Sequence, residues 1–226
     1  LIEIDVGMGR CGVAPGEDAV TLARAIAARP GLRFSGLQAY HGAAQHLRKP
    51  AERAAAIEHA ANLARDTAAL LRDAGLPCET IAGAGTGTYE NELASGIYTE
   101  LQCGSYAFMD ADYGRNETAT PFANALFVLA SVISAAAPDR AVCDAGLKAM
   151  SLESGLPVVS GADGVTYIKA TDEHGQLSLT ADAKVKLGDR IRLIPGHCDP
   201  TVNLHDWLVA VRGGEVEAVW ATARGW

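Results

Sequence analysis

The sequence has no Cys-x-x-Cys pair, no signal peptide and no apolar run long enough to cross a bilayer. Its five cysteines are odd in number and far apart, which argues against a disulfide framework and against a zinc ribbon. The longest apolar run, residues 123–137, is interrupted by Asn124 and two serines and is too short for a membrane span. These absences predict a cytoplasmic protein that does not act at a membrane.

A basic surface is also missing. The formal net charge is −8 and the 19 Lys and Arg residues are scattered along the chain, so the sequence predicts no nucleic-acid partner. The 226 residues are 49% hydrophobic, which is enough to bury the core of one large domain or of two smaller ones.

The chain begins without a methionine, and residues 1–6 already have the pattern of a strand. We therefore expect the whole protein to continue upstream. Strand and helix then alternate, which favours parallel βα units. The predicted helices and strands are, in chain order, 17–28, 33–39, 50–74, 78–82 and 100–103.

Each of these strands runs into a loop with glycines or reactive side chains, as expected for a (β/α) barrel with its active site at the carboxyl ends of the strands. Four strands make only half of such a barrel. Beyond it, β-branched runs separated by turn residues predict antiparallel strands at 127–134, 165–170, 190–194, 207–211 and 217–221. We predict an α/β plus β protein: the second half of a (β/α)8 barrel over residues 1–118, then a mostly antiparallel β domain over 119–226.

The segment 194–204 places an imidazole, a thiol and a carboxylate in consecutive positions, His197, Cys198 and Asp199. Pro195, Gly196 and Pro200 favour an extended or turned backbone there. In an extended segment alternate side chains share a face, so His197 and Asp199 form a candidate site for Mn, Mg, Co or Zn. The alternative is a turn in which Asp199 caps backbone amides.

The longer string IPGHCDPTVNLHDW, residues 194–207, closely resembles the metal-site segment of D-threonine aldolases and the related D-serine dehydratases. These enzymes depend on pyridoxal phosphate and a divalent metal. The dehydratases typically have a cysteine two residues after the histidine, whereas Asp199 is the aldolase-like choice. The resemblance implies Mn, Mg or Co rather than Zn.

Two glycine-rich loops, residues 83–88 and 104–106, follow the last two barrel strands. Such loops cradle phosphates, although the glycines could simply make tight βα turns. The resemblance to alanine-racemase-like enzymes implies that they bind the cofactor phosphate, and that an arginine and a tyrosine contact the cofactor as well. The implied cofactor-binding residues are Arg10, Tyr40, Gly85, Thr86, Gly87, Gly104, Ser105 and Tyr106. For Arg10, a surface ion pair with a nearby carboxylate is the alternative.

His46 matches a histidine proposed as general base in the aldolases, and an imidazole can take a proton from a substrate hydroxyl. A solvent-facing histidine at a helix start is the alternative. The resemblance thus predicts a lyase that cleaves D-3-hydroxy-amino acids to glycine and an aldehyde. A D-serine or 3-hydroxyaspartate dehydratase is the second interpretation, because Cys198 is adjacent to Asp199.

A cofactor lysine is missing from the predicted half barrel. None of the five lysines follows a barrel strand, and in the family the lysine that forms the Schiff base lies upstream, on the first strand. The chain alone is therefore expected to lack activity. The alternative is a cofactor-binding module that needs a partner, and the resemblance implies a homodimer.

Overall fold

The computed structural model describes residues 1–117 and 121–224, and these form two compact units. The first unit comprises residues 1–106 and, of the described residues, 115–117. The second comprises residues 107–114 and 121–224 of the described chain. The segment 107–114 therefore belongs to the second unit, although it precedes the boundary predicted at residue 118.

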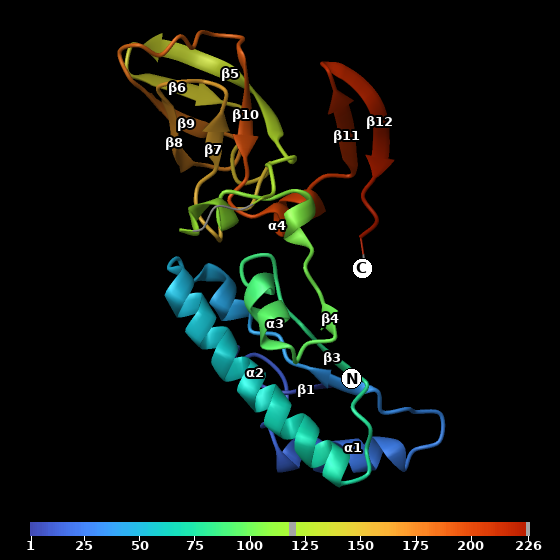
Figure 1. Ribbon diagram of the computed structural model, residues 1–226. Coiled ribbons are helices and arrows are strands. Elements are labelled where there is room, and N and C mark those ends of the chain that lie inside the picture. Colours follow the sequence, from blue (N-terminus) through green and yellow to red (C-terminus); the bar gives the residue numbers. More distant parts are fainter. Residues whose placement is uncertain (118–120, 225–226) are drawn as a thin grey trace. The chain divides into compact units, whose positions relative to one another are not determined.

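The first unit contains a parallel four-stranded sheet in the order β1-β2-β3-β4 (Figure 1). Its strands are β1 (Ile2–Glu3), β2 (Gly36–Gln38), β3 (Thr80–Gly83) and β4 (Glu100–Leu101). Leu37 is paired with Ile2 on one side and with Ile81 on the other, which aligns β1, β2 and β3. All four carboxyl ends consequently lie at one edge, as the alternating βα pattern predicts.

Helices α1 (Glu17–Ala27) and α2 (Pro50–Asp73) pack against this sheet through small apolar residues. Ala60, Ala64 and Ala68 give α2 a narrow alanine stripe that lets it approach the sheet closely. Gly75, with φ of +73°, follows the end of the helix in a left-handed conformation. Both predicted helices are confirmed to within one residue at each end. The short helix α3 (Tyr89–Ser95) and the 3₁₀ turn η1 (Gly42–His46) complete the elements used below.

The second unit is built on an antiparallel six-stranded sheet in the order β7-β10-β5-β6-β9-β8. Its strands are β5 (Val128–Ala137), β6 (Arg140–Cys143), β7 (Val158–Ser160), β8 (Val165–Ala170), β9 (Gly175–Leu179) and β10 (Arg190–Ile194). Leu177, Leu193 and Met150 are fully buried in its core. The predicted β domain is therefore confirmed, including the bounds of β8 and β10.

Three strands of this sheet, β6, β7 and β9, are not predicted from the sequence. They are three to five residues long, which is too short for an alternating pattern to stand out. A separate hairpin of β11 (Trp207–Arg212) and β12 (Glu215–Ala221) follows, close to the predicted runs. Among the described residues, no helix is long and apolar enough to span a membrane.

The close approach of β2 to β3 gives a test of the parallel sheet. Gly36 has φ of +144°, and a Cβ there would lie 1.8 Å from the carbonyl oxygen of Thr80. We expect Gly36→Ala to lower the free energy of unfolding of the first unit by about 3 kcal/mol or more, because backbone atoms must move. Urea unfolding followed by far-ultraviolet circular dichroism, which α1 and α2 dominate, measures this.

Gly31→Ala is the matched control. Gly31 also has a positive φ, +80°, but a Cβ there would meet no atom within 4 Å. Only the strain of the left-handed backbone remains, so a loss of about 1 kcal/mol is expected. Equal losses for the two variants would contradict the packing of β2 against β3.

Candidate metal centre and cofactor-binding loops

In the segment that contains His197, the backbone passes from extended to helical immediately after this residue. Strand β10 ends at Ile194, His197 is extended with φ of −139° and ψ of 132°, and helix α4 (Cys198–Asn203) starts immediately after it. The extended backbone predicted through Asp199 is therefore wrong beyond His197. Pro200 is compatible with a helix here because it lies in the first turn, where its missing N–H costs no hydrogen bond.

A carboxylate that the sequence analysis did not select holds His197. Oδ2 of Asp110 lies 2.8 Å from Nδ1 of His197 and accepts the backbone N–H of Cys198 at 2.9 Å. Its other oxygen, Oδ1, accepts the backbone N–H of Tyr113 at 2.9 Å. Asp110 is fully buried, whereas the side chain of His197 is 23% exposed. A buried acid thus fixes a histidine that faces outward in part.

Backbone hydrogen bonds join the two segments that carry this pair. The N–H of Ala111 donates to the carbonyl of Pro195 at 2.9 Å, and the N–H of Asp112 donates to that of Gly196 at 3.1 Å. Met109, just before Asp110, has φ of +54°, a left-handed conformation unusual for a residue with a side chain. This strained backbone lies immediately before Asp110, whose carboxylate is hydrogen-bonded to His197.

The pair is strongly coupled electrostatically. The hydrogen bond that His197 donates to Asp110 raises the pKa of His197 to about 10, with a further contribution from Cys198. Burial would raise the pKa of Asp110, but the hydrogen bonds from His197, Tyr113 and Cys198 outweigh burial and lower it. Asp110 is therefore ionised at neutral pH and stabilises a proton on Nδ1 of His197.

The donor set around His197 suits a cation. Ligand atoms of Asp110, His197 and Cys198 all lie within 4.8 Å of one another. Both oxygens of Asp110 already accept N–H groups, so Asp110 orients the ring, and Nε2 of His197 is the nitrogen left to bind a metal. A carboxylate on the second ring nitrogen is the usual support of a metal-binding histidine.

Asp199, the second predicted ligand, is exposed in the first turn of α4. It does not belong to the three-residue group around His197. Because a helix rotates each residue by about 100° from the last, the alternation argument that paired Asp199 with His197 does not apply. Its role as a ligand stays a prediction.

The two glycine-rich loops of the first unit follow β3 and β4. Oγ1 of Thr86 accepts the backbone N–H of Tyr106 at 2.9 Å, which joins the loops to each other. Among the described residues, the backbone N–H groups of Gly85, Thr86, Gly104 and Ser105 have no acceptor in the chain. Four such donors in two adjoining loops are what a phosphate group requires. The N–H of Gly87, in contrast, donates to Oε1 of Gln45 at 2.9 Å.

Arg10 and Tyr40 lie together in the first unit. The guanidinium carbon of Arg10 is 5.8 Å from the centre of the Tyr40 ring. Arg10 also forms an ion pair with Glu3 at 3.8 Å, which is the alternative role predicted for it from the sequence. The neighbouring loop is shaped by Asp5, whose Oδ1 accepts the N–H groups of Gly7 and Gly9. The structure thus brings together the two residues predicted to contact the cofactor ring.

His41 and His46 differ in burial. Burial lowers the pKa of His41, and among the described residues its buried Nδ1 has no hydrogen-bond partner. His46 is exposed at the end of η1. Its role as general base stays a prediction.

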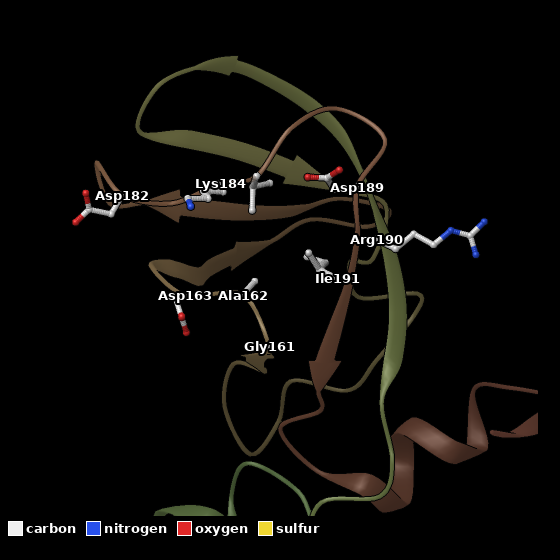
Figure 2. Close-up of a pocket in the computed structure, with 9 residues that line it drawn as sticks. Gly161, Ala162, Asp163, Asp182, Lys184, Asp189, Arg190 and Ile191 are labelled. Atoms are coloured by element: carbon white, nitrogen blue, oxygen red, sulfur yellow. The ribbon is translucent and has the colours of Figure 1, made fainter. Parts of the chain in front are cut away.

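A cavity of about 460 Å³ lies in the six-stranded sheet of the second unit, near β10 and the segment before it (Figure 2). Its charged lining residues are Asp163, Asp182, Lys184, Asp189 and Arg190. Asp189 is already held, because its Oδ2 accepts the backbone N–H of Lys186 at 2.9 Å. None of the predicted site residues lines this cavity.

Comparison with known families divides the chain in a similar way. Residues 1–112 match the family "Alanine racemase, N-terminal domain", and residues 125–211 match the family "Putative serine dehydratase domain". The first match covers the parallel sheet with both glycine-rich loops. The second covers β5 to β10 and the His197 segment.

Curated relatives cover the whole chain. D-threonine aldolase from Arthrobacter sp. is 54% identical over 231 residues, and 3-hydroxy-D-aspartate aldolase from Paracoccus denitrificans (strain Pd 1222) is 52% identical over 233 residues. D-threo-3-hydroxyaspartate dehydratase from Delftia sp. (strain HT23) is more distant, at 28% identity. The chain spans about 60% of the length of the two aldolases.

A solved structure agrees with these matches. The crystal structure of D-threonine aldolase from Filomicrobium marinum superposes with a TM-score of 0.95 at 48% identity, covering 98% of this chain and 62% of that one. The sequence resemblance and the predicted combination of barrel and β domain are therefore confirmed. The chain is a homologue of the D-threonine and 3-hydroxyaspartate aldolases and has an alanine-racemase-like fold.

Proposed function

We propose that the whole protein is a pyridoxal phosphate- and divalent-metal-dependent lyase that cleaves D-3-hydroxy-amino acids to glycine and an aldehyde. The observation that carries this proposal is the buried Asp110 carboxylate on Nδ1 of His197, which leaves Nε2 to bind a cation. The identity of 54% and 52% to two aldolases, against 28% to a dehydratase, supports the aldolase over the dehydratase.

The first unit would hold the cofactor. The N–H groups of Gly85, Thr86, Gly104 and Ser105 would donate to the phosphate, since they have no acceptor among the described residues. Arg10 and Tyr40 would contact the cofactor ring, with the ion pair to Glu3 limiting the movement of Arg10. In the first unit the described lysines comprise only Lys49, which pairs with Glu52.

The second unit would hold Mn, Mg or Co. His197 would ligate through Nε2 and Asp199 through a carboxylate oxygen, which are suitable donors for these ions. Asp110 would keep the proton on Nδ1 and thereby fix both the tautomer and the direction of the ring. Open coordination positions would then remain for water and for the substrate hydroxyl.

When bound, pyridoxal phosphate would accept the electron pair of the broken Cα–Cβ bond, and the cation would acidify the β-hydroxyl. The residues of the chain would move the proton. His46 would take it from the β-hydroxyl at an imidazole nitrogen as the C–C bond breaks and the aldehyde carbonyl forms. Cα would then gain one proton, which completes glycine, and His46 would return the proton it took to solvent, so that atoms and charge balance.

A dehydratase is the second candidate, because the thiol of Cys198 lies in the same group of potential ligands as His197. If the thiol rather than the carboxylate of Asp199 binds the cation, the site resembles the His and Cys pattern of the dehydratases. Cys198 is only 3% exposed, however, which limits its access to a cation beside His197.

Product analysis separates the two candidates. The whole protein, given D-threonine with pyridoxal phosphate and Mn²⁺, is expected to release acetaldehyde and glycine, and to lose this activity when a chelator removes the metal. Chromatographic identification of the products provides the measurement. Formation of 2-oxobutyrate and ammonia would instead identify a dehydratase.

Asp110→Asn tests the support of His197. An amide cannot accept all three N–H groups that now converge on this carboxylate, so the imidazole loses its fixed tautomer. We expect about 10- to 100-fold weaker Mn²⁺ binding by calorimetric titration. Asp144→Asn is the control, because Asp144 also accepts a backbone N–H in the second unit, from Ser131 at 2.7 Å. Equal Mn²⁺ affinities for the two variants would show that Asp110 does not support metal binding.

The identity of the second ligand is tested by a pair of adjacent substitutions. We expect Asp199→Ala to abolish tight Mn²⁺ binding and Cys198→Ala to preserve it, since Mn²⁺ prefers carboxylate oxygen to sulfur. The same titration measures both. The opposite result would assign the thiol as ligand and favour the dehydratase.

A further inference from the structure

The side chain of Gln45 is completely buried against the phosphate-binding loop of the first unit. It belongs to η1, between Ala44 and the exposed His46. A buried amide must satisfy its oxygen and its nitrogen inside the protein, because an unpaired polar group there is destabilising. Gln45 satisfies both on residues of the loop that follows β3.

Both ends of the amide bind the loop. Oε1 of Gln45 accepts the backbone N–H of Gly87 at 2.9 Å, and Nε2 donates to Oγ1 of Thr88 at 2.7 Å. A Cβ at Gly85 would lie 2.5 Å from the same Oε1, so the amide packs directly on Gly85 as well. One side chain thereby fixes three residues of the loop.

The contact continues into helix α3. Oγ1 of Thr88 donates to Oε1 of Glu92 at 2.7 Å, and Glu92 is 1% exposed. Burial raises the pKa of Glu92, which disfavours a negative charge behind the loop. The chain of hydrogen bonds from Gln45 through Thr88 to Glu92 ties the end of the loop to the start of α3.

The backbone of Gln45 is anchored independently. Nδ2 of Asn116 donates to the carbonyl of Gln45 at 3.2 Å, and Oδ1 of Asn116 accepts a hydrogen bond from Arg48 at 2.8 Å. The backbone carbonyl of Gln45 is thus held by a side chain from outside the loop. This makes Gln45 a fixed support rather than a side chain that adapts to the loop.

The contacts of Gln45 with the loop determine which backbone N–H groups can still donate to an anion. Gly87 and Tyr106 use their N–H groups inside the protein, whereas those of Gly85 and Thr86 have no acceptor among the described residues. We infer that Gln45 is a positioning residue that holds the loop 83–88 in its phosphate-binding conformation. This inference rests on the proposed function, since it assumes that the loop binds the phosphate of pyridoxal phosphate.

The test compares pyridoxal phosphate with pyridoxal, which lacks the phosphate. Equilibrium dialysis of the whole protein gives the affinity ratio of the two ligands, and this ratio isolates the phosphate contribution. Gln45→Met keeps the volume but removes the hydrogen bonds of the side-chain amide, those to Gly87 and Thr88 included. We expect it to reduce the ratio about tenfold or more, the effect of about 1.4 kcal/mol, while pyridoxal itself binds as before.

Thr88→Val gives a second test that does not depend on the folding of Gln45→Met. Valine keeps the shape of threonine but cannot accept from Nε2 of Gln45, so a reduction of about three- to tenfold in the ratio is expected. Thr88→Ser restores the hydroxyl and should restore the ratio. Gln38→Met is the control, because Gln38 also donates from an amide, to Gln102 at 2.8 Å, and among the described residues its side chain has no hydrogen bond to the loop 83–88.

The outcomes distinguish this inference from the proposed function. If the variants weaken pyridoxal and pyridoxal phosphate equally, or leave the ratio unchanged, Gln45 does not position the phosphate loop, and the inference is overturned. If the unaltered protein itself shows no preference for pyridoxal phosphate over pyridoxal, the proposed cofactor site fails, and the inference fails with it.

Discussion

The hydrogen bond between Asp110 and His197 is the interaction on which the candidate metal centre depends. An imidazole alone can rotate and can carry its proton on either nitrogen, so it defines neither the direction nor the affinity of a metal site. The buried carboxylate, held by two backbone N–H groups, removes both freedoms. Backbone hydrogen bonds of Ala111 and Asp112 to Pro195 and Gly196 keep the two segments in register. The second unit thus supplies the rigid scaffold that an open metal site needs.

The first unit applies the same principle to an anion. Its parallel strands bring two glycine-rich loops to one edge of a sheet, but glycine loops have many conformations available to them. Internal hydrogen bonds select one of these: Gln45 binds Gly87 and Thr88, and Thr86 binds Tyr106. The N–H groups without an internal acceptor are then the ones available to a phosphate. In both units, buried polar side chains decide which groups remain available at the surface.

The sequence predicts the fold well because the fold follows from local patterns. The helices at 17–27 and 50–73 and the strands at 165–170 and 190–194 have strong periodicity and clear end signals. The candidate site is predicted less completely. His197 is found because it lies in a distinctive string, but Asp110 lies 87 residues away, so no sequence spacing connects the two. Helix α4 is not predicted, because Pro195, Gly196 and Pro200 favour an extended or turned backbone, although Pro200 fits the first turn of a helix. The role of Gln45 is not predicted either, because its hydrogen-bond partners lie in another loop.

The measurement that tests this account most directly is an anomalous difference map from crystals of the protein soaked in Mn²⁺. The account predicts one strong peak bonded to Nε2 of His197, with Nδ1 still hydrogen-bonded to Asp110. A peak between Nδ1 and the Asp110 carboxylate would show that Asp110 is itself a ligand. That result, or a peak that does not involve His197, would contradict the claim that a buried carboxylate orients the histidine for metal binding.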